Sequence, residues 1–215
     1  MTKPLEKTVA ALLQRHGKTY AEEAEIGLKD TPSPLYQLLV LSTLLSARIS
    51  ADIAVAAARE LFSAGYKTPE KMAAASWQQR VNALGRGHYR RYDERTSTML
   101  GEGAELLQQK FGGDLRRLRR ESEGTGQLIK GLQLFPGIGP TGAGIFCREA
   151  QGVWPELAPY LDKKVLDGAK RLGLPDSAKA LSGLVGKDDL PRFAAACVRA
   201  ALDKDIVEEV KQVAG

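Results

Sequence analysis

LQLFPGIGPTGAGIF, residues 132–146, places four glycines and two prolines between two apolar runs. The apolar runs are typical of helices. Pro136-Gly137-Ile138-Gly139 is typical of a tight turn, because glycine tolerates positive φ and proline cannot continue a helix. A helix that ends at Phe135 and another that begins near Pro140 would form a helix–hairpin–helix. The stretch therefore predicts a sharp corner between two helices.

The predicted hairpin would direct several backbone N–H groups at one point. Gly137 and Gly139 carry no side chain over their amides, and the amides that open the next helix, up to Thr141, point the same way. Such a cluster binds phosphate, and phosphate contacts position a protein on DNA without reading its sequence. A purely structural αα corner is the other interpretation of these residues, and both stay open.

Helical periodicity dominates the rest of the chain. Caps followed by proline, or by a capping box, predict helix starts at Ser33-Pro34, Ser50, Thr68-Pro69 and Ser76 with Gln79. Further helices are expected over residues 5–16, 90–111, 125–134, 140–151, 159–172, 176–185 and 191–213, the last in one or two pieces. No run alternates with the Val, Ile and Thr content of a strand. The sequence predicts an all-α fold.

Composition indicates a soluble protein with a moderate basic excess. The 215 residues are 43% hydrophobic and 27% charged, with a net charge of +5, which favours a polyanionic partner without establishing one. The longest apolar run, LLVLSTLLSA, is about half a membrane span, and the N-terminal residues lack the pattern of a signal peptide. Cys147 and Cys197 are expected to be buried, reduced thiols. We expect a cytoplasmic protein that has no cofactor, binds no metal and contacts no membrane.

Four segments, in matching order, resemble the endonuclease III branch of the helix–hairpin–helix (HhH-GPD) DNA glycosylase superfamily. LLVLSTLLSARIS is similar to the family's LLSAQ segment, Gly87-His88-Tyr89 to its Gly-Leu-Tyr loop, LFPGIGPTGAGIF to its hairpin and Leu161-Asp162 to its Val-Asp. The resemblance spans residues 30 to about 175. It implies two lobes: a helical-barrel domain over 30–140 that ends in the hairpin, and a second helical domain formed by residues 1–29 with 141–215.

The resemblance implies a base-excision-repair enzyme. A monofunctional DNA glycosylase flips a damaged or mismatched base out of duplex DNA and hydrolyses its N-glycosidic bond. Asp162 lies in the position of the family's catalytic aspartate, where it would stabilise the positive charge that develops on the sugar and orient the attacking water. A first-turn acid that offsets a helix dipole is the other interpretation of Asp162. Asp167 is the neighbouring carboxylate with which it could be confused.

Two features of that family are missing from this sequence. Thr141 stands where bifunctional members have a lysine, and a hydroxyl cannot form the Schiff base that strand nicking requires. The family's four cluster-binding cysteines have no counterpart, since Cys197 stands alone, so no iron–sulfur cluster is expected. Lys163 and Lys164 follow Asp162, and they leave a bifunctional glycosylase/AP lyase as an alternative, although phosphate contact or a solvated face is their plainer interpretation. The alternative from another class is a catalytically silent DNA-damage-binding module.

Other residues fit the extrusion of a base. Arg48 occupies the place of the family's gap-filling glutamine and could bond the orphaned base, and His88 occupies the wedge position. Arg86, Arg90 and Arg91 alternate with tyrosines and are candidates for contact with the DNA backbone. The arginine cluster at 116–120 is interpreted as a solvated surface. The expected partner is double-stranded DNA that contains a lesion or mismatch, bound by a monomer. The sequence does not distinguish among an alkylated purine, an oxidised pyrimidine, uracil and a mismatched thymine as the base that such an enzyme would excise.

Overall fold

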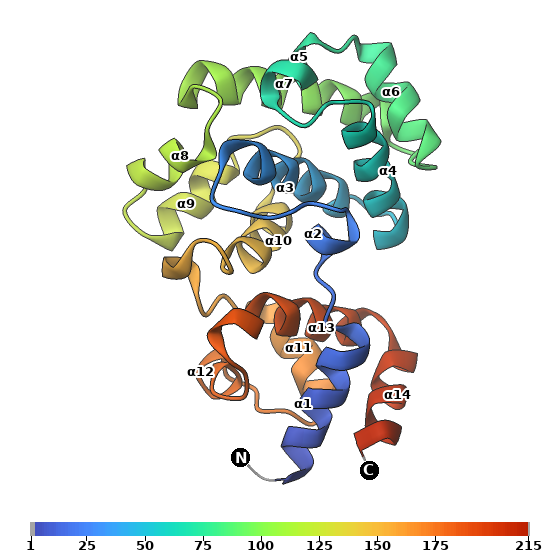
Figure 1. The fold of residues 1–215 in the computed structure, drawn as a ribbon, viewed down its shortest axis with the longest axis vertical. Coiled ribbons are helices and arrows are strands. Elements are labelled where there is room, and N and C mark those ends of the chain that lie inside the picture. Colours follow the sequence, from blue (N-terminus) through green and yellow to red (C-terminus); the bar gives the residue numbers. More distant parts are fainter. Residues whose placement is uncertain (1–2, 215) are drawn as a thin grey trace. The chain divides into compact units, whose positions relative to one another are not determined.

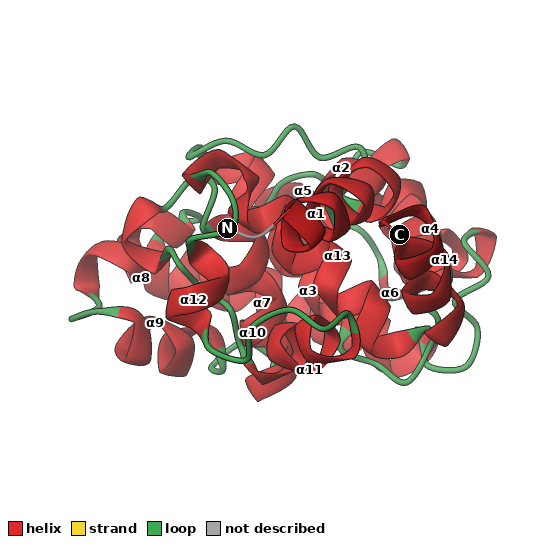
Figure 2. Ribbon diagram, turned by 90° about the horizontal axis from the view of Figure 1, so that it is seen from below, coloured by secondary structure: helices red, strands yellow, loops and turns green. Residues whose placement is uncertain are grey.

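The computed structural model describes residues 3–214, and every regular element within this range is a helix (Figures 1 and 2). The prediction of an all-α fold is confirmed. No helix in the described range has both the length and the apolar character needed to span a membrane. Met1, Thr2 and Gly215, which the predicted second domain includes, lie outside the described residues.

The chain divides into two compact units. Unit 1 comprises Met1–Tyr20 with Cys147–Gly215, and unit 2 comprises Ala21–Phe146, so the division falls inside helix α10 (Pro140–Ala150). The helical barrel and the two-lobed arrangement expected from the sequence stay predictions.

Unit 2 is built around α3 (Pro32–Leu45), which is buried along most of its length. Ten consecutive side chains, from Leu35 to Leu44, are buried, as a nearly continuous apolar sequence requires. Helices α4 and α8 pack on α3, while α7 packs against α5, α6 and α8 (Figure 1). The other helices are α2 (Tyr20–Glu23), which begins at the boundary, α4 (Ala51–Ser63), α5 (Pro69–Ala74), α6 (Trp77–Arg86), α7 (Asp93–Phe111), α8 (Leu115–Glu121) and α9 (Thr125–Leu132).

A buried arginine ties three helices of unit 2 together. Arg80, on α6, donates from Nη1 to the carbonyls of Met72 (3.0 Å) and Ala75 (2.5 Å), and from Nε to the carbonyl of Ser97 on α7 (3.0 Å). Gly101 leaves room for this side chain, since a Cβ there would lie 2.7 Å from Nη2. Burial lowers the pKa of Arg80, but carbonyl dipoles at the end of α5 stabilise the cation.

Several predicted helix starts are confirmed. Ser50 and Thr68 cap α4 and α5: their hydroxyl oxygens accept hydrogen bonds from the backbone amides of Ile53 and Lys71, three residues further along the chain. Ser76 and Gln79 form the complete capping box at the start of α6.

The predicted start of α3 is wrong by two residues. Thr31 is the N-cap and Pro32 the first helical residue, whereas the sequence suggested Ser33 and Pro34. Instead of capping, the Ser33 hydroxyl donates to the carbonyl of Lys67 (2.9 Å). Two further bounds also differ from prediction: α9 ends at Leu132 and not at Phe135, and α7 begins at Asp93 and not at Arg90.

Helix α8 was not predicted. The arginine cluster lies on it, with Leu115 and Leu118 buried beneath. Arg116 pairs with Asp114 (2.8 Å) and Arg119 with Asp30 (2.9 Å), so two of these arginines have carboxylate partners within unit 2.

Unit 1 is organised around α13 (Leu190–Leu202), which packs against α1, α11 and α14. Its side chains from Phe193 to Val198 are all buried. The other elements are α1 (Lys3–His16), the end of α10, the 3-10 turn Pro155–Leu157, α11 (Lys163–Arg171), α12 (Ala178–Ser182), the 3-10 turn Lys187–Asp189 and α14 (Lys204–Ala214). The segment predicted over 191–213 thus forms two helices.

Helices α11 and α13 approach each other at a glycine. An ideal Cβ on Gly168 would lie 1.8 Å from the carbonyl oxygen of Cys197 and 3.1 Å from the amide nitrogen of Ala201. The two backbones can meet at this distance only because residue 168 has no side chain. Cys197 is buried, as is Cys147 on α10. Burial raises the pKa of each thiol to about 12, so both stay protonated at neutral pH.

Gly168→Ala is expected to destabilise the protein strongly, because the added methyl group would meet backbone atoms that cannot rotate away. We expect a loss of about 3 kcal/mol or more in the free energy of unfolding, as for severe overpacking. Urea denaturation followed by circular dichroism measures it. Gly186→Ala is the matched control, since no atom lies within 4 Å of its Cβ position. Equal midpoints for the two variants would contradict the close contact.

Candidate functional site

Asp162 is the N-cap of α11. Its backbone is extended (φ −76°, ψ 178°), and its Oδ1 accepts hydrogen bonds from the backbone amides of Lys164 (3.1 Å) and Val165 (3.2 Å). The helix expected over 159–172 therefore begins at Lys163, and Asp162 lies just before its first turn. A carboxylate in this position satisfies two open amides and meets the positive end of the helix dipole.

The second oxygen of Asp162 pairs with an arginine that the sequence analysis missed. Nη1 of Arg148, on α10, donates to Oδ2 of Asp162. The Arg148 side chain is 10% exposed and that of Asp162 is 26% exposed, so a nearly buried cation faces a carboxylate that solvent still reaches. One signal was available in the sequence: Arg148 and Glu149 interrupt a run of small and apolar residues, and a buried charge requires a partner.

A glutamine holds the segment that leads to Asp162. Gln151 is buried, its Oε1 accepts from the backbone amide of Tyr160 (2.9 Å), and its Nε2 donates to the carbonyls of Tyr160 (3.3 Å) and Arg148 (2.8 Å). Burial, followed by the neighbouring Cys147 thiol and the Asp162 carboxylate, raises the pKa of Tyr160 to about 12. A neutral, half-buried phenol therefore belongs to the surroundings of the carboxylate.

The two lysines after Asp162 lie on the surface. Nζ of Lys163 donates to both carboxylate oxygens of Asp167, each at 3.0 Å, and Lys164 is exposed. Asp167 therefore pairs with Lys163, four residues before it. The carboxylate of Asp162 has other partners, so the two carboxylates differ in their surroundings.

The predicted corner is present in unit 2, between α9 and α10. Gly137 has φ of +83°, and a Cβ there would lie 3.0 Å from both Met99 Sδ and Thr43 Cγ2. Both the conformation and the space therefore require glycine. Gly139 and Thr141 are exposed at the start of α10, with nothing within 4 Å of the Cβ position of Gly139. The contact of these residues with phosphate stays a prediction.

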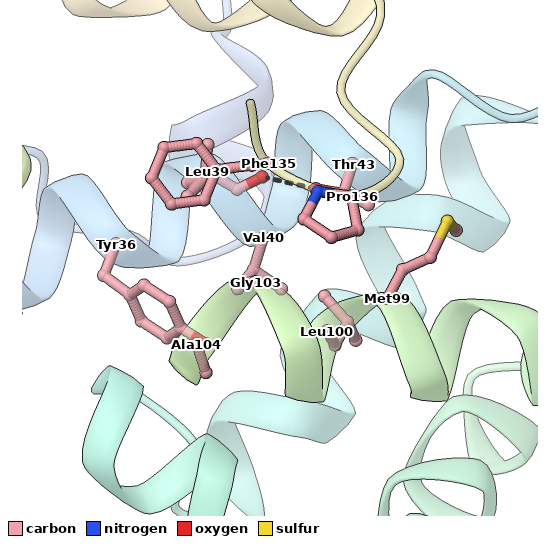
Figure 3. A pocket seen from close by; sticks show the side chains of 10 residues that line it. All are labelled: Tyr36, Leu39, Val40, Thr43, Met99, Leu100, Gly103, Ala104, Phe135 and Pro136. Carbon is pink, nitrogen blue, oxygen red and sulfur yellow. Dashed lines mark hydrogen bonds between the residues drawn. The ribbon is translucent and has the colours of Figure 1, made fainter. Parts of the chain in front are cut away.

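The hairpin lies against a small recess between α3 and α7 (Figure 3). Phe135 and Pro136 of the hairpin line the recess together with Tyr36, Leu39, Val40, Thr43, Met99, Leu100, Gly103 and Ala104. Tyr36 is 1% exposed, and Trp154 in unit 1 is fully buried. Both rings are therefore core residues of their own units.

The segment with Arg48 lies beside the hairpin. The hydroxyl of Ser46, just after α3, donates to the carbonyl of Gly137 (3.2 Å). Arg48 follows two residues later and is exposed. The structure thus brings these two predicted DNA-contact segments together within unit 2.

The loop with His88 projects between two buried anchors. Gly87 packs on α4, where a Cβ would lie 2.4 Å from Cα of Ala57, and Tyr89 is fully buried. His88 between them is exposed and has φ of +62°, which is uncommon for a residue other than glycine. The loop is therefore held at both ends and presents one imidazole to solvent.

The arginines around this loop differ in their partners. Arg86 pairs with Glu60 (2.7 Å), and the guanidinium of Arg91 lies 5.3 Å from the centre of the Tyr92 ring. Arg86 and Arg90 line a shallow groove with Val81, Asn82, Gly85 and Asp93.

Within residues 3–214, no three His, Cys, Asp or Glu side chains gather in a way that could hold a metal ion.

The fold is similar to that of endonuclease III. A solved structure of a non-covalent endonuclease III–DNA complex matches 93% of this chain and 85% of its own chain, with a TM-score of 0.51 and 18% identity. A trapped endonuclease III–DNA covalent intermediate, an estranged-adenine complex, matches over the same shares with a TM-score of 0.48 and 18% identity. No known family model and no curated protein matches the sequence.

Asp162→Ala and Asp162→Asn are expected to differ in stability. Both leave the Arg148 guanidinium without its carboxylate, but asparagine keeps an oxygen that can cap α11. Alanine should therefore lower the free energy of unfolding by about 1 kcal/mol more than asparagine does, the usual contribution of an N-cap. Urea denaturation of the two variants and the wild type measures the difference. Identical midpoints for alanine and asparagine would show that the cap contributes nothing.

Proposed function

We propose that the chain is a DNA glycosylase of base-excision repair that hydrolyses the N-glycosidic bond of a damaged or mismatched base flipped out of duplex DNA. The observation that carries the proposal is the carboxylate of Asp162. It is fixed by three hydrogen bonds, remains partly exposed, and occupies the position of the catalytic aspartate in the resembled family. The fold similarity to endonuclease III, which is known in complex with DNA, supports the same class.

The chemistry requires a negative charge beside the sugar. When the bond between C1′ and the base nitrogen breaks, its electron pair leaves with the base and the sugar becomes positively charged. A fixed carboxylate stabilises that charge without reorganising. Water then attacks C1′ and loses a proton, which the carboxylate can orient or accept.

Hydrolysis without strand nicking follows from the residues at the motif positions. Thr141 cannot form an imine, and Lys163 is engaged with Asp167. We therefore assign water as the nucleophile and the product as an abasic site. Arg48 and His88 would fill the gap left by the extruded base, and the hairpin glycines would hold a phosphate.

A DNA-binding module without turnover is the second candidate. One observation favours it: every contact of Asp162 also has a structural purpose, since Oδ1 caps a helix and Oδ2 neutralises a nearly buried guanidinium. Such a protein would retain the hairpin and bind damaged DNA without releasing a base.

Base release from a set of duplexes separates these two candidates. The duplexes carry 7-methylguanine, thymine glycol, uracil opposite guanine, or thymine opposite guanine, and hot alkali reveals abasic sites. The wild type should release at least one base. Asp162→Asn should reduce the single-turnover rate by at least about 100-fold, the scale on which positioned groups contribute to catalysis, while DNA binding persists. Asp167→Asn is the matched carboxylate control and should retain the rate. Absence of release from every duplex would favour the binding module.

Borohydride trapping tests the assignment of water as nucleophile. An imine between a lysine and C1′ is reduced to a stable protein–DNA adduct, whereas hydrolysis leaves no covalent intermediate. The wild type should release base, leave strands intact until alkali is added, and give no adduct. Strong trapping that disappears in Lys163→Arg or Lys164→Arg would replace this assignment with the bifunctional alternative.

A further inference from the structure

Helix α10 presents two polar side chains to the segment that carries Asp162. Arg148 and Gln151 are three residues apart, and side chains at this spacing share one face of a helix. Gln151 binds both the N–H and the C=O of Tyr160, much as a neighbouring strand would. Arg148 binds the side chain of Asp162, two residues further on. One helix face thus fixes the backbone at 160 and the carboxylate at 162.

The carboxylate is held from two sides. The backbone amides of α11 occupy Oδ1, and Arg148 occupies Oδ2. An ionised carboxylate has about four acceptor positions on its two oxygens. Two on Oδ1 and one on Oδ2 are taken, which leaves one position on Oδ2, and the side chain is partly exposed. Only this last position is available to a reacting group.

The roles of the two polar side chains differ. Gln151 and the start of α11 hold the backbone around Asp162 whether or not Arg148 is present. Arg148 touches only the carboxylate of this residue, so its removal would leave the segment in place and the carboxylate held from one side only, by the α11 amides on Oδ1. A change at 148 therefore reports on the orientation of the carboxylate.

We propose that Arg148 is a positioning residue, which orients the Asp162 carboxylate so that its remaining Oδ2 acceptor position faces the reacting sugar or the attacking water. The proposal rests on the proposed glycosylase function. Two effects of Arg148 oppose each other. Its positive charge offsets part of the negative charge that would stabilise the sugar cation, whereas its hydrogen bond fixes the geometry. Because a misplacement of about 1 Å can reduce a rate about 100-fold, orientation is the larger effect.

Single-turnover base release by Arg148→Gln tests the proposal, on whichever of the four duplexes the wild type processes fastest. The rate should fall by about 10- to 100-fold, the scale of a lost alignment, while the Kd for the same duplex stays within about two-fold of the wild type. Arg148→Lys, whose ammonium can still reach Oδ2, should recover part of the rate. Arg148→Met, which keeps an apolar stem of similar length, is the second variant should Arg148→Gln fail to fold.

Arg192→Gln is the matched control. Arg192, on α13 of the same unit, forms an ion pair (2.7 Å) with Asp189 of the preceding 3-10 turn, and it is not among the hydrogen-bond partners of Asp162. Its loss should leave both the rate and the Kd unchanged. All rates are compared at a temperature at which circular dichroism shows each variant to be folded.

The outcomes separate the proposal from the function on which it rests. An unchanged or faster rate in Arg148→Gln or Arg148→Met, with an active wild type, overturns the positioning role and leaves the glycosylase intact. A rate loss matched by an equal loss of DNA affinity also overturns it, because Arg148 would then bind DNA. A wild type that releases no base from any duplex overturns the function and the positioning role together.

Discussion

The contact between Gly168 and the backbone of Cys197 is the constraint on which unit 1 depends. It places α11 directly against the central helix α13, and the start of α11 determines where the backbone of Asp162 lies. From the other side, Gln151 of α10 holds the backbone of Tyr160, two residues before Asp162. The candidate carboxylate is therefore mounted on packed helices, which is a condition for a preorganised site.

The Asp162 carboxylate would have two roles, one structural and one in the proposed function. As an N-cap it stabilises a helix, and as a charged acceptor it suits the development of positive charge on a sugar. The guanidinium of Arg148 plays no part in the cap: it pairs with Oδ2, and in the proposed function it would offset part of the negative charge that the sugar cation requires. Partial exposure of Asp162 reconciles the two roles, because one acceptor position remains open to a ligand.

Features of the fold that depend on residues close together in the sequence were predictable. Features that depend on residues far apart in the sequence were not. Ser76 with Gln79 forms the capping box that its spacing predicts. Thr31-Pro32-Ser33-Pro34 offers the same cap–proline signal twice, and the sequence gives no reason to prefer the first. Helix α8 contains only two buried leucines, too few to reveal a period. Asp162 could be named as a candidate because its motif is local, whereas its partner Arg148 lies 14 residues away and is brought to it by tertiary packing.

Labelling of the two cysteines can report on local opening of this structure. Cys147 and Cys197 are buried, and burial raises the pKa of each thiol to about 12, so we expect both to react slowly with thiol reagents in the folded protein. Modification can proceed only when the helix that shields each thiol opens. Since Cys197 also supplies the carbonyl against which Gly168 rests, its labelling rate follows the opening of the contact that holds α11, and thus the lifetime of the assembled carboxylate site.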